Sequence, residues 1–297
     1  MSPIQRGTAA AAAPAGPVIA DPRREFAFSD ADFDHLSKLA YEHAGIVLGE
    51  SKRNLVYSRL SRRLRTLNIE SFGAYREHIG TNPREIENFV NSISTNHTKF
   101  FRESHHFDHF RTHVADHFAR AARGGVNRLR IWSAGCSSGE EPYTIAVVLK
   151  HQVSDIARYD ARILATDIDT DILAKAARAE YPTTALEEVP AAYREYFEKA
   201  PGARAEANVV LAEEIRALIA YRQLNLMGAW PMKGLFDAIF CRNVMIYFDA
   251  PTKSKLVERF TQQLKPGGWL YIGHSESLIG SHPGLQLQGR TIYRREA

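Results

Sequence analysis

Two glycines and two carboxylates lie close together in the stretch Leu129–Tyr143, LRIWSAGCSSGEEPY. Gly135 and Gly139 follow an apolar run, and Glu140 and Glu141 come directly after the second glycine. Glycines in such a turn allow the backbone to pass close to a ligand, because no Cβ fills the space. A phosphate loop would have a longer gap between its glycines and then a Lys, and two carboxylates would repel a phosphate. The stretch therefore argues against a nucleoside triphosphate, and the dinucleotide spacing G-x-G-x-x-G is also absent.

A further acid follows in the stretch Arg162–Asp169, RILATDID. An acid at the carboxyl end of the second strand of a doubly wound sheet can accept both ribose hydroxyls, and we expect Asp167 to do so. For Asp169, capping of the next helix, Asp171 to Ala179, is the preferred interpretation. A ligand with hydroxyl groups and an ammonium group but no phosphate fits both stretches, and S-adenosylmethionine is the common one.

An α/β fold is needed to bring these side chains together. The glycine turn is preceded by a predicted strand and followed by a helix that begins near Glu140, as in the entry unit of a nucleotide-binding sheet. Later segments repeat the alternation of strand and helix. They are a buried strand over Phe236–Cys241, the segment Arg242–Phe248 at its carboxyl end, a helix over Pro251–Leu264, a strand over Trp269–Gly273 and a terminal hairpin over Leu285–Arg294.

Composition places the chain among ordinary globular proteins, with 44% hydrophobic and 24% charged residues. No apolar run reaches the roughly 18 residues of a membrane span, so we expect no membrane insertion. Cys136 and Cys241 are too few for a disulfide framework, which favours a reduced, cytoplasmic protein. Residues 1–24 are rich in Ala and Pro and lack the apolar core of a secretory signal, so we predict a disordered tail there.

A basic helix is predicted early in the chain, in a small helical domain over residues 25–93. The segment Lys52–Arg65 contains six cations and no acid. On a helix its leucines line one face and its cations an adjacent face, which could meet an anionic surface or simply be solvated. Nucleic acid is disfavoured as the partner, because Tyr57 is the sole aromatic residue among the cations and no nucleic-acid-binding motif is present.

Three other segments have residue types that could do chemistry. The stretch Ser94–Glu103, STNHTKFFRE, has more polar and aromatic groups than a linker needs. In the next predicted helix, Ser104 to Ala122, four histidines share a face, but no partner ligands lie at zinc-like spacing and we predict no metal site. GHSES, Gly273 to Ser277, departs from the nucleophile elbow G-x-S-x-G at its last position, which disfavours a serine hydrolase.

The α/β alternation is interrupted between residues 181 and 224. Short β-like runs at Val209–Leu211 and Leu218–Arg222 predict an inserted antiparallel β subdomain, since a parallel pair needs only one crossover helix. Its edges could add a strand from a partner, or the segment could be a mere excursion of the fold.

Taken together, five motifs resemble the CheR family of chemotaxis receptor methyltransferases. They occur in family order from about Phe26 onward. The motifs are TNHTKFFRE (Thr95–Glu103), WSAGCSSGEEPY (Trp132–Tyr143), ATDID (Ala165–Asp169), FDAIFCRNVMIYF (Phe236–Phe248) and GHSESL (Gly273–Leu278).

The resemblance implies a Rossmann-like methyltransferase domain over residues 126–297, with the inserted β subdomain at about 181–224. A linker and helix with a cofactor-contacting motif would occupy residues 94–125, after the all-α N-terminal domain. The implied activity is methylation of glutamate side chains on the cytoplasmic helices of chemoreceptors, with S-adenosylmethionine as methyl donor, S-adenosylhomocysteine as product and no metal. The implied enzyme is a cytoplasmic monomer.

Site residues carried over from the family fall into three groups. The catalytic positions are Arg102 and Tyr247, which would lie nearest the transferred methyl group. The cofactor-binding positions are Asn96, Thr98, Arg102, Gly135, Glu141, Asp167, Asn225, Leu226, Arg242 and Asn243. The receptor-binding positions on the basic helix are Lys52, Arg53, Arg59, Arg62 and Arg63.

Two other functions remain open on the sequence alone. A methyltransferase of the same fold could use another acceptor, such as a small molecule or a nucleic acid, although no N-P-P-Y-like tetrapeptide is present. A catalytically silent relative could sense S-adenosylmethionine or dock on receptors. An RNA-binding protein is a third, disfavoured alternative, which a steep fall of affinity with salt would reveal.

Overall fold

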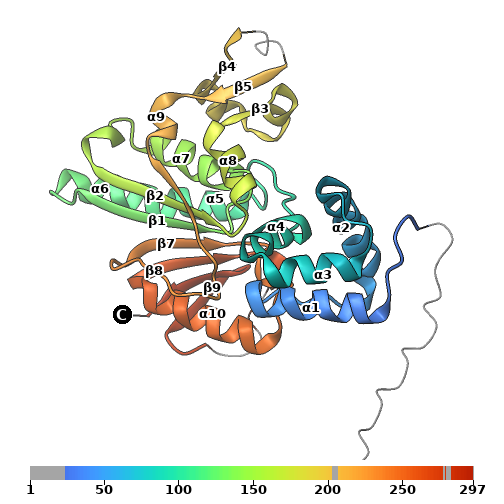
Figure 1. Cartoon of the computed structure of the whole chain (residues 1–297). Helices are drawn as coiled ribbons and strands as arrows, with labels where there is room; N and C mark the ends of the chain where they lie inside the picture. The colour runs from blue at the N-terminus through green and yellow to red at the C-terminus, as the bar shows by residue number, and fades with distance from the viewer. Residues whose placement is uncertain (1–23, 203–206, 277, 279–281, 297) are drawn as a thin grey trace, which may run out of the picture.

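The computed structural model describes residues 24–202, 207–276, 278 and 282–296. A group of N-terminal helices lies beside an α/β sheet, and a small second sheet lies at the far end of the α/β part (Figure 1). The tail predicted for residues 1–24 lies outside the described residues except for Arg24.

The N-terminal helices form a bundle with a core of its own. Ser29 caps the first helix, since its hydroxyl accepts a hydrogen bond from the Asp32 amide, and Gly45 ends it in a left-handed conformation. Leu36, Leu60 and Phe89 are fully buried between the helices. The helices are α1 (Asp30–Ala44), α2 (Arg53–Leu67), α3 (Phe72–Thr81) and α4 (Pro83–Ile93).

In the described part of the chain, seven strands form the main sheet in the order β6-β2-β1-β7-β8-β10-β9. The five strands from β6 to β8 run parallel, and β10 and β9 extend the sheet antiparallel. The carboxyl ends of the parallel strands therefore share one edge. The strands are β1 (Arg128–Ala134), β2 (Asp160–Asp167), β6 (Ile219–Gln223), β7 (Phe236–Cys241), β8 (Leu264–Ile272), β9 (Leu285–Gly289) and β10 (Ile292–Arg295).

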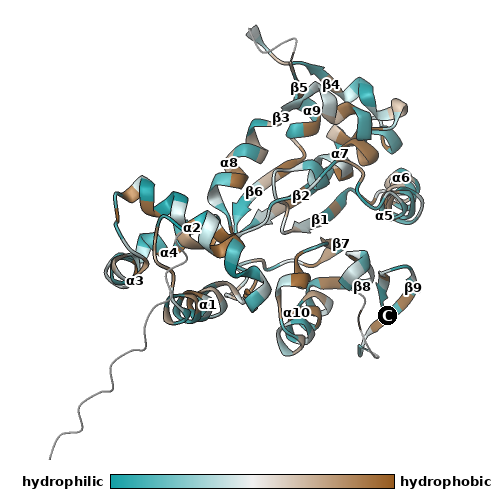
Figure 2. Ribbon diagram, turned by 90° about the vertical axis from the view of Figure 1, so that its right-hand side faces the viewer, coloured by the Kyte–Doolittle hydropathy of each residue, from teal (hydrophilic) through white to brown (hydrophobic). Residues whose placement is uncertain are grey.

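Helices cover both faces of this sheet, so apolar residues gather between layers (Figure 2). On one face Phe107, Phe110 and Val147 pack with Phe240, and on the other the helix α10 packs against Trp132. The helices are α5 (His105–Phe110), α6 (Asp116–Arg123), α7 (Glu140–Gln152), α8 (Thr170–Arg178), α9 (Glu213–Arg216) and α10 (Ala250–Gln263), with a π-helical turn over Arg111–Ala115 between α5 and α6.

The inserted segment is smaller than the sequence predicted. Antiparallel strands β3 (Glu180–Pro182), β5 (Asn208–Leu211) and β4 (Phe197–Lys199) form a separate sheet in the order β3-β5-β4. The run Leu218–Arg222, which we expected in the same insert, instead forms β6 and pairs parallel with β2 in the main sheet. That part of the prediction is wrong, because a short β-like run does not reveal which sheet it joins.

Other predicted elements are confirmed with shifts of a few residues at their ends. The strand Phe236–Cys241 and the terminal hairpin are present, and Asp169 caps α8 by accepting hydrogen bonds from two backbone amides. No helix among the described residues is long and apolar enough to cross a membrane.

Candidate functional site

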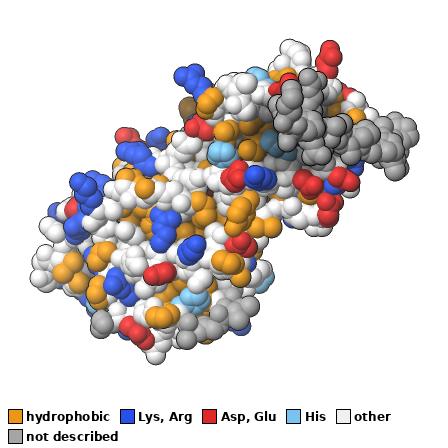
Figure 3. All heavy atoms as spheres, turned by 60° about the horizontal axis from the view of Figure 1, so that its bottom comes forward, with side chains coloured by type: hydrophobic (Ala, Val, Ile, Leu, Met, Phe, Trp, Pro, Cys, Tyr) orange, Lys and Arg blue, Asp and Glu red, His pale blue; other side chains and the backbone are white. Residues whose placement is uncertain are grey.

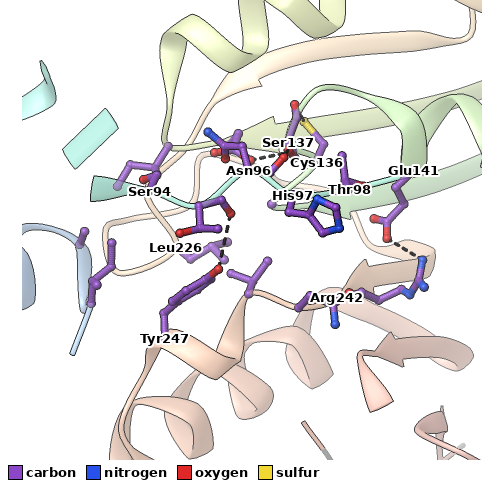
Figure 4. Close-up of a pocket in the computed structure, with 18 of the residues that line it drawn as sticks. Ser94, Asn96, His97, Thr98, Cys136, Ser137, Glu141, Leu226, Arg242 and Tyr247 are labelled. Carbon is purple, nitrogen blue, oxygen red and sulfur yellow. Dashed lines mark hydrogen bonds and ion pairs between the residues drawn. The ribbon is translucent and has the colours of Figure 1, made fainter. Parts of the chain in front are cut away.

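A pocket lies at the carboxyl edge of the parallel strands, between the main sheet and the N-terminal helices. Figure 4 shows many of its lining residues. They come from the segments after β1, β2, β6 and β7, from the segment that joins α4 to α5 and from the end of α1. The structure brings every residue that the sequence assigned to the cofactor or to catalysis to this one pocket. They are Asn96, Thr98, Arg102, Gly135, Glu141, Asp167, Asn225, Leu226, Arg242, Asn243 and Tyr247. Their contacts with a ligand stay predictions.

The glycine turn after β1 is shaped by the protein itself. Gly135 has φ 82°, and a Cβ there would lie 2.3 Å from the Val244 side chain. Gly139 has φ 97°, and its Cβ would lie within about 3 Å of the hydroxyls of Tyr181 and Tyr221. The sequence suggested that a closely approaching ligand requires glycine at these two positions. In the structure, neighbouring side chains of the protein already leave no room for a Cβ at either position.

Asp167 orders the turn through its carboxylate. Its Oδ2 accepts a hydrogen bond of 2.8 Å from the Ser137 amide, and its Oδ1 accepts one of 3.1 Å from the Asp169 amide. Burial raises the pKa of Asp167, and these amide hydrogen bonds oppose that rise. Asp167 lines the pocket, and a carboxylate has more acceptor positions than these two bonds use, so hydroxyl groups of a ligand could donate to it.

A buried ion network forms the other end of the pocket, where Glu141 faces Arg242 (Figure 4). Arg242 Nη1 donates to Glu141 Oε2 at 3.1 Å, and Ser133 donates to the other carboxylate oxygen at 2.7 Å. Arg242 Nη2 donates to the Arg102 carbonyl and lies 3.5 Å from Glu103 Oε2. Burial raises the pKa of Glu141 against the opposing effect of Arg242. Burial also acts to raise the pKa of Glu103, but Arg242, His274 and His106 together outweigh burial and lower that pKa.

Arg102 lies in a strained part of the backbone. Its neighbours Phe101 and Glu103 have φ of 52° and 57°, in the left-handed region that non-glycine residues rarely adopt. Its Nη1 donates to the His97 carbonyl at 3.0 Å. Such strain persists where surrounding contacts hold it, and it is common at functional sites.

Tyr247 lies across the pocket from this ion network (Figure 4). Its hydroxyl is 3.5 Å from the Thr95 carbonyl, which is a weak hydrogen bond at most, and its own carbonyl accepts from the Val47 amide at 2.9 Å. The Tyr247 backbone is thereby fixed to the N-terminal helical part, while its hydroxyl lies at the pocket.

The N-terminal helical part supplies a wall that the sequence did not predict. Ala44 and Ile46 line the pocket, and Asn225 Nδ2 donates to the His43 carbonyl at 2.6 Å. The Asn225 amide thus holds the two parts of the chain together. His97, Cys136 and Ser137 were also missed, although all three stand inside motifs that the sequence singled out.

Four cations of the basic helix α2 are bound within the protein, among them Arg65, which pairs with Glu25 at 3.1 Å. Arg53 pairs with Glu50 and Asp30, and Arg63 pairs with the buried Glu85. Arg59 donates to the carbonyls of Ile93 and Ser94 at 2.6 and 2.7 Å. Lys52 and Arg62 are exposed.

The four histidines that share a predicted face, His106, His109, His113 and His117, lie in α5, the π-helical turn and α6. The described residues contain no cluster of three or more side chains that could hold a metal ion. Burial lowers the pKa of His106 to about 3 and that of His109 to about 4, so both rings are neutral at pH 7. His106 Nε2 bonds the Thr291 hydroxyl at 3.1 Å, and His109 Nδ1 bonds the Tyr271 hydroxyl at 3.0 Å. His106 is therefore a core residue, and His109 is a partly buried residue at the edge of the core.

The donor set of the pocket fits the expected cofactor. Carboxylates of Asp167 and Glu141 suit hydroxyl groups and positive charge, and Leu226 and Ile168 offer apolar surface to a base. With strand ends that meet at this pocket, the sheet has the arrangement of the Rossmann-like S-adenosylmethionine-dependent methyltransferases.

Comparison with known proteins gives the family. Residues 96–293 match the CheR methyltransferase, SAM binding domain, and residues 31–94 match the CheR methyltransferase, all-alpha domain. The chain belongs to the CheR methyltransferase family.

Three relatives match most of their own length and of this chain. Chemotaxis protein methyltransferase 2 of Pseudomonas aeruginosa is 44% identical over 275 residues, covering 91% of this chain and 95% of the relative. The chemotaxis protein methyltransferase of Klebsiella aerogenes is 40% identical and covers 98% of each chain. That of Escherichia coli is 41% identical, covering 90% of this chain and 91% of the relative.

Proposed function

We propose that this chain transfers a methyl group from S-adenosylmethionine to glutamate side chains of chemoreceptors, forming glutamate methyl esters. The observation that carries this proposal is that the Arg102 guanidinium has donors that are not used by the described part of the protein. Its Nη1 bonds the His97 carbonyl, and among the described residues its Nε and Nη2 have no partner. A guanidinium with donors to spare at a pocket suits a carboxylate acceptor. The names of the relatives support chemotaxis as the setting.

In the bound state the sulfonium of the cofactor supplies an electrophilic methyl group and becomes the thioether of S-adenosylhomocysteine. Asp167 would accept hydrogen bonds from the ribose, and Glu141 would lie beside the cofactor at the glycine turn. Asn96 and Thr98 would contact it from the segment between the domains, Asn225 and Leu226 would flank the adenine, and Arg242 and Asn243 would close the pocket.

A glutamate acceptor needs no general base. Its unperturbed pKa is about 4.3, so the carboxylate is already ionised at neutral pH. Arg102 would orient that carboxylate by charge-assisted hydrogen bonds, and Tyr247 would orient it from the other side of the pocket. The work of the protein is therefore alignment of an acceptor oxygen with the methyl group.

The acceptor in this proposal is a cytoplasmic receptor helix that approaches two exposed cations, Lys52 in the 3-10 turn before α2 and Arg62 in α2. Lys52 and Arg62 would meet its acidic groups directly, and Arg59, which bonds only carbonyl oxygens among the described residues, would add positive potential. The charges of Arg53 and Arg63 are offset by their acidic partners, so these two residues would shape this surface rather than attract the acceptor. The proposed enzyme is a cytoplasmic monomer that uses neither nucleic acid nor membrane insertion.

The proposal is tested by mapping the product. The full chain is incubated with S-adenosylmethionine and a purified chemoreceptor cytoplasmic fragment, and the fragment is digested and analysed by tandem mass spectrometry. Methyl groups on glutamate side chains are expected. Methyl groups confined to lysine, or cofactor binding with no modified peptide, would overturn it in favour of another acceptor or a silent cofactor sensor.

A further inference from the structure

Glu276 belongs to the GHSES motif, to which the proposed function assigns no role. It lies in the short 3-10 turn His274–Glu276 after β8, and its side chain is 5% exposed. It does not line the pocket. A buried carboxylate outside the pocket is costly unless it is fully hydrogen-bonded, so its partners indicate its purpose.

All of the polar partners of Glu276 given by the structure are backbone amides. Its Oε2 accepts from the Asn243 and Gly273 amides, both at 2.7 Å, and its Oε1 accepts from the Ile246 amide at 3.0 Å. Two of these donors belong to the segment Arg242–Phe248, which follows β7. The carboxylate therefore joins the end of β8 to the segment after β7.

That segment supplies several pocket side chains from an irregular backbone. Arg242, Asn243, Val244 and Tyr247 all line the pocket, and Asn243 has φ 60°. A left-handed non-glycine residue costs energy unless neighbouring contacts hold it. Two hydrogen bonds that the Glu276 side chain accepts, from the Asn243 and Ile246 amides at the two ends of the turn, provide such contacts.

The position of Glu276 also explains why residue 273 is a glycine. A Cβ at Gly273 would lie 2.6 Å from Glu276 Oε2 and 2.9 Å from the Asn243 amide nitrogen. Any other residue would push the carboxylate away from the amides that it binds. Gly273 and Glu276 thus work as one unit, which accounts for the spacing G-x-x-E in this motif.

We propose that Glu276 is a positioning residue for methyl transfer, which sets the places of Asn243 and Tyr247 through the backbone of the segment after β7. It acts without touching the cofactor or the acceptor. This inference rests on the methyltransferase activity of the chain but not on glutamate as the acceptor.

The test is the variant Glu276→Gln, with Ser275→Ala as control. The glutamine keeps the shape, but its NH2 group must face at least one backbone N–H, so the turn loses a hydrogen bond and gains a repulsion. We expect kcat to fall about tenfold to a hundredfold, since small misplacements have such effects, while KM for the acceptor changes less than about threefold. Ser275 is exposed, and among the described residues its hydroxyl bonds only the neighbouring His274 ring, so Ser275→Ala should keep the wild-type kcat.

A double-mutant cycle with Tyr247→Phe separates positioning from general destabilisation. If Glu276 acts through the place of Tyr247, Glu276→Gln should lower kcat markedly less in the Tyr247→Phe background than in the wild type. Hydrogen exchange should also be faster at the amides from Asn243 to Tyr247 and unchanged in α2. Full additivity in the cycle, or wild-type kcat in folded Glu276→Gln, would overturn the inference.

Glu276→Asp keeps the test decisive if the glutamine variant does not fold. The shorter carboxylate retains its charge but cannot reach both ends of the turn at the observed distances. Faster exchange at Asn243–Tyr247 together with a lowered kcat is expected. Wild-type kcat despite faster exchange at these amides would show that the turn does not need the carboxylate for catalysis.

Discussion

At the residue scale, we expect substitution of Arg242 to destabilise the protein strongly. Its guanidinium lies against Glu141 and Glu103, and the Phe107 ring is 5.2 Å away. Arg242→Ala leaves two buried carboxylates without their cation, which costs about 3 kcal/mol of unfolding free energy. Urea unfolding measures this loss. Exposed Arg162→Ala is the control, and an equal, small effect of both variants would contradict the role of the network.

Arg102 is expected to affect chemistry more than binding. Arg102→Ala removes the side chain that would orient the acceptor but leaves Asp167, Glu141 and the glycine turn in place. Methyl transfer should fall by at least about a hundredfold, while the Kd for S-adenosylmethionine rises less than about tenfold. Single-turnover kinetics and calorimetric titration measure the two effects. Wild-type turnover would refute the assignment of Arg102.

At the element scale, Glu85 joins three helices of the N-terminal bundle. It lies in α4, forms two hydrogen bonds of 2.6 and 2.8 Å with Arg63 of α2, and accepts from the Tyr75 hydroxyl of α3 at 2.9 Å. Glu85→Gln should lower the unfolding free energy by about 2 kcal/mol at pH 7. Glu87→Gln, on the exposed side of α4, should have almost no effect. Equal stability of the two variants would contradict this stabilising role of Glu85.

The stabilising effect of Glu85 should depend on pH. Burial tends to raise its pKa, but hydrogen bonds from Arg63, Asn88 and Tyr75 outweigh burial and lower it. A carboxyl group with a lowered folded pKa stabilises above its unfolded pKa of about 4.3, and that stability is lost as the pH falls through the folded value. The difference between wild type and Glu85→Gln should therefore shrink below about pH 4. A difference that stays constant down to pH 2 would contradict this sign.

The glycine turn gives a second prediction at this scale. Gly135→Ala combines a positive φ with a Cβ placed 2.3 Å from Val244, so either Val244 or the turn must move. We expect the affinity for S-adenosylmethionine to fall at least about tenfold. Gly80→Ala in α3 meets nothing within 4 Å and should leave binding unchanged. Isothermal titration calorimetry decides, and wild-type affinity of Gly135→Ala would show that the turn is more adaptable than its geometry implies.

Helices and strands could be predicted from the sequence where the local residue pattern alone determines the type of element. Phe236–Cys241 is uniformly apolar apart from Asp237, and Pro251 marks the first turn of α10. The structure adds Asp249 as the residue that caps this helix. Ile219–Gln223 could not be assigned to a sheet, because its half-exposed residues carry no register information and its partner β2 is far away in sequence. The motifs located the site, but the hydrogen bonds of Asp167, Asn225 and Arg59 depend on tertiary contacts that spacing does not encode.

At the scale of the whole molecule, acceptor recognition depends on where exposed charge lies. Figure 3 shows cationic and anionic side chains interspersed over the face drawn there, with no single large patch of one sign. The helices α2 and α6 lie on opposite sides of the molecule in Figure 1. An exposed arginine on α6 can therefore serve as a control for an exposed arginine on α2. Charge at α2 should matter for the acceptor, and charge at α6 should not.

Arg62→Glu therefore tests the proposed receptor surface. Reversing this exposed charge should raise KM for the receptor fragment severalfold, more at low salt than at high salt, with the Kd for S-adenosylmethionine unchanged. Arg120→Glu on α6 makes the same charge change and should leave KM unaltered. Equal effects of both variants would indicate net charge rather than a docking site on α2.

The central claim is that this chain esterifies carboxylates. The most direct measurement is transfer of a radiolabelled methyl group from S-adenosylmethionine to membranes that contain chemoreceptors, followed by mild alkali. We predict label in the receptor band that alkali releases as methanol, since esters hydrolyse readily, and loss of that label with Arg102→Ala. Label that survives alkali, or a receptor band without label although the chain binds the cofactor, would contradict the account.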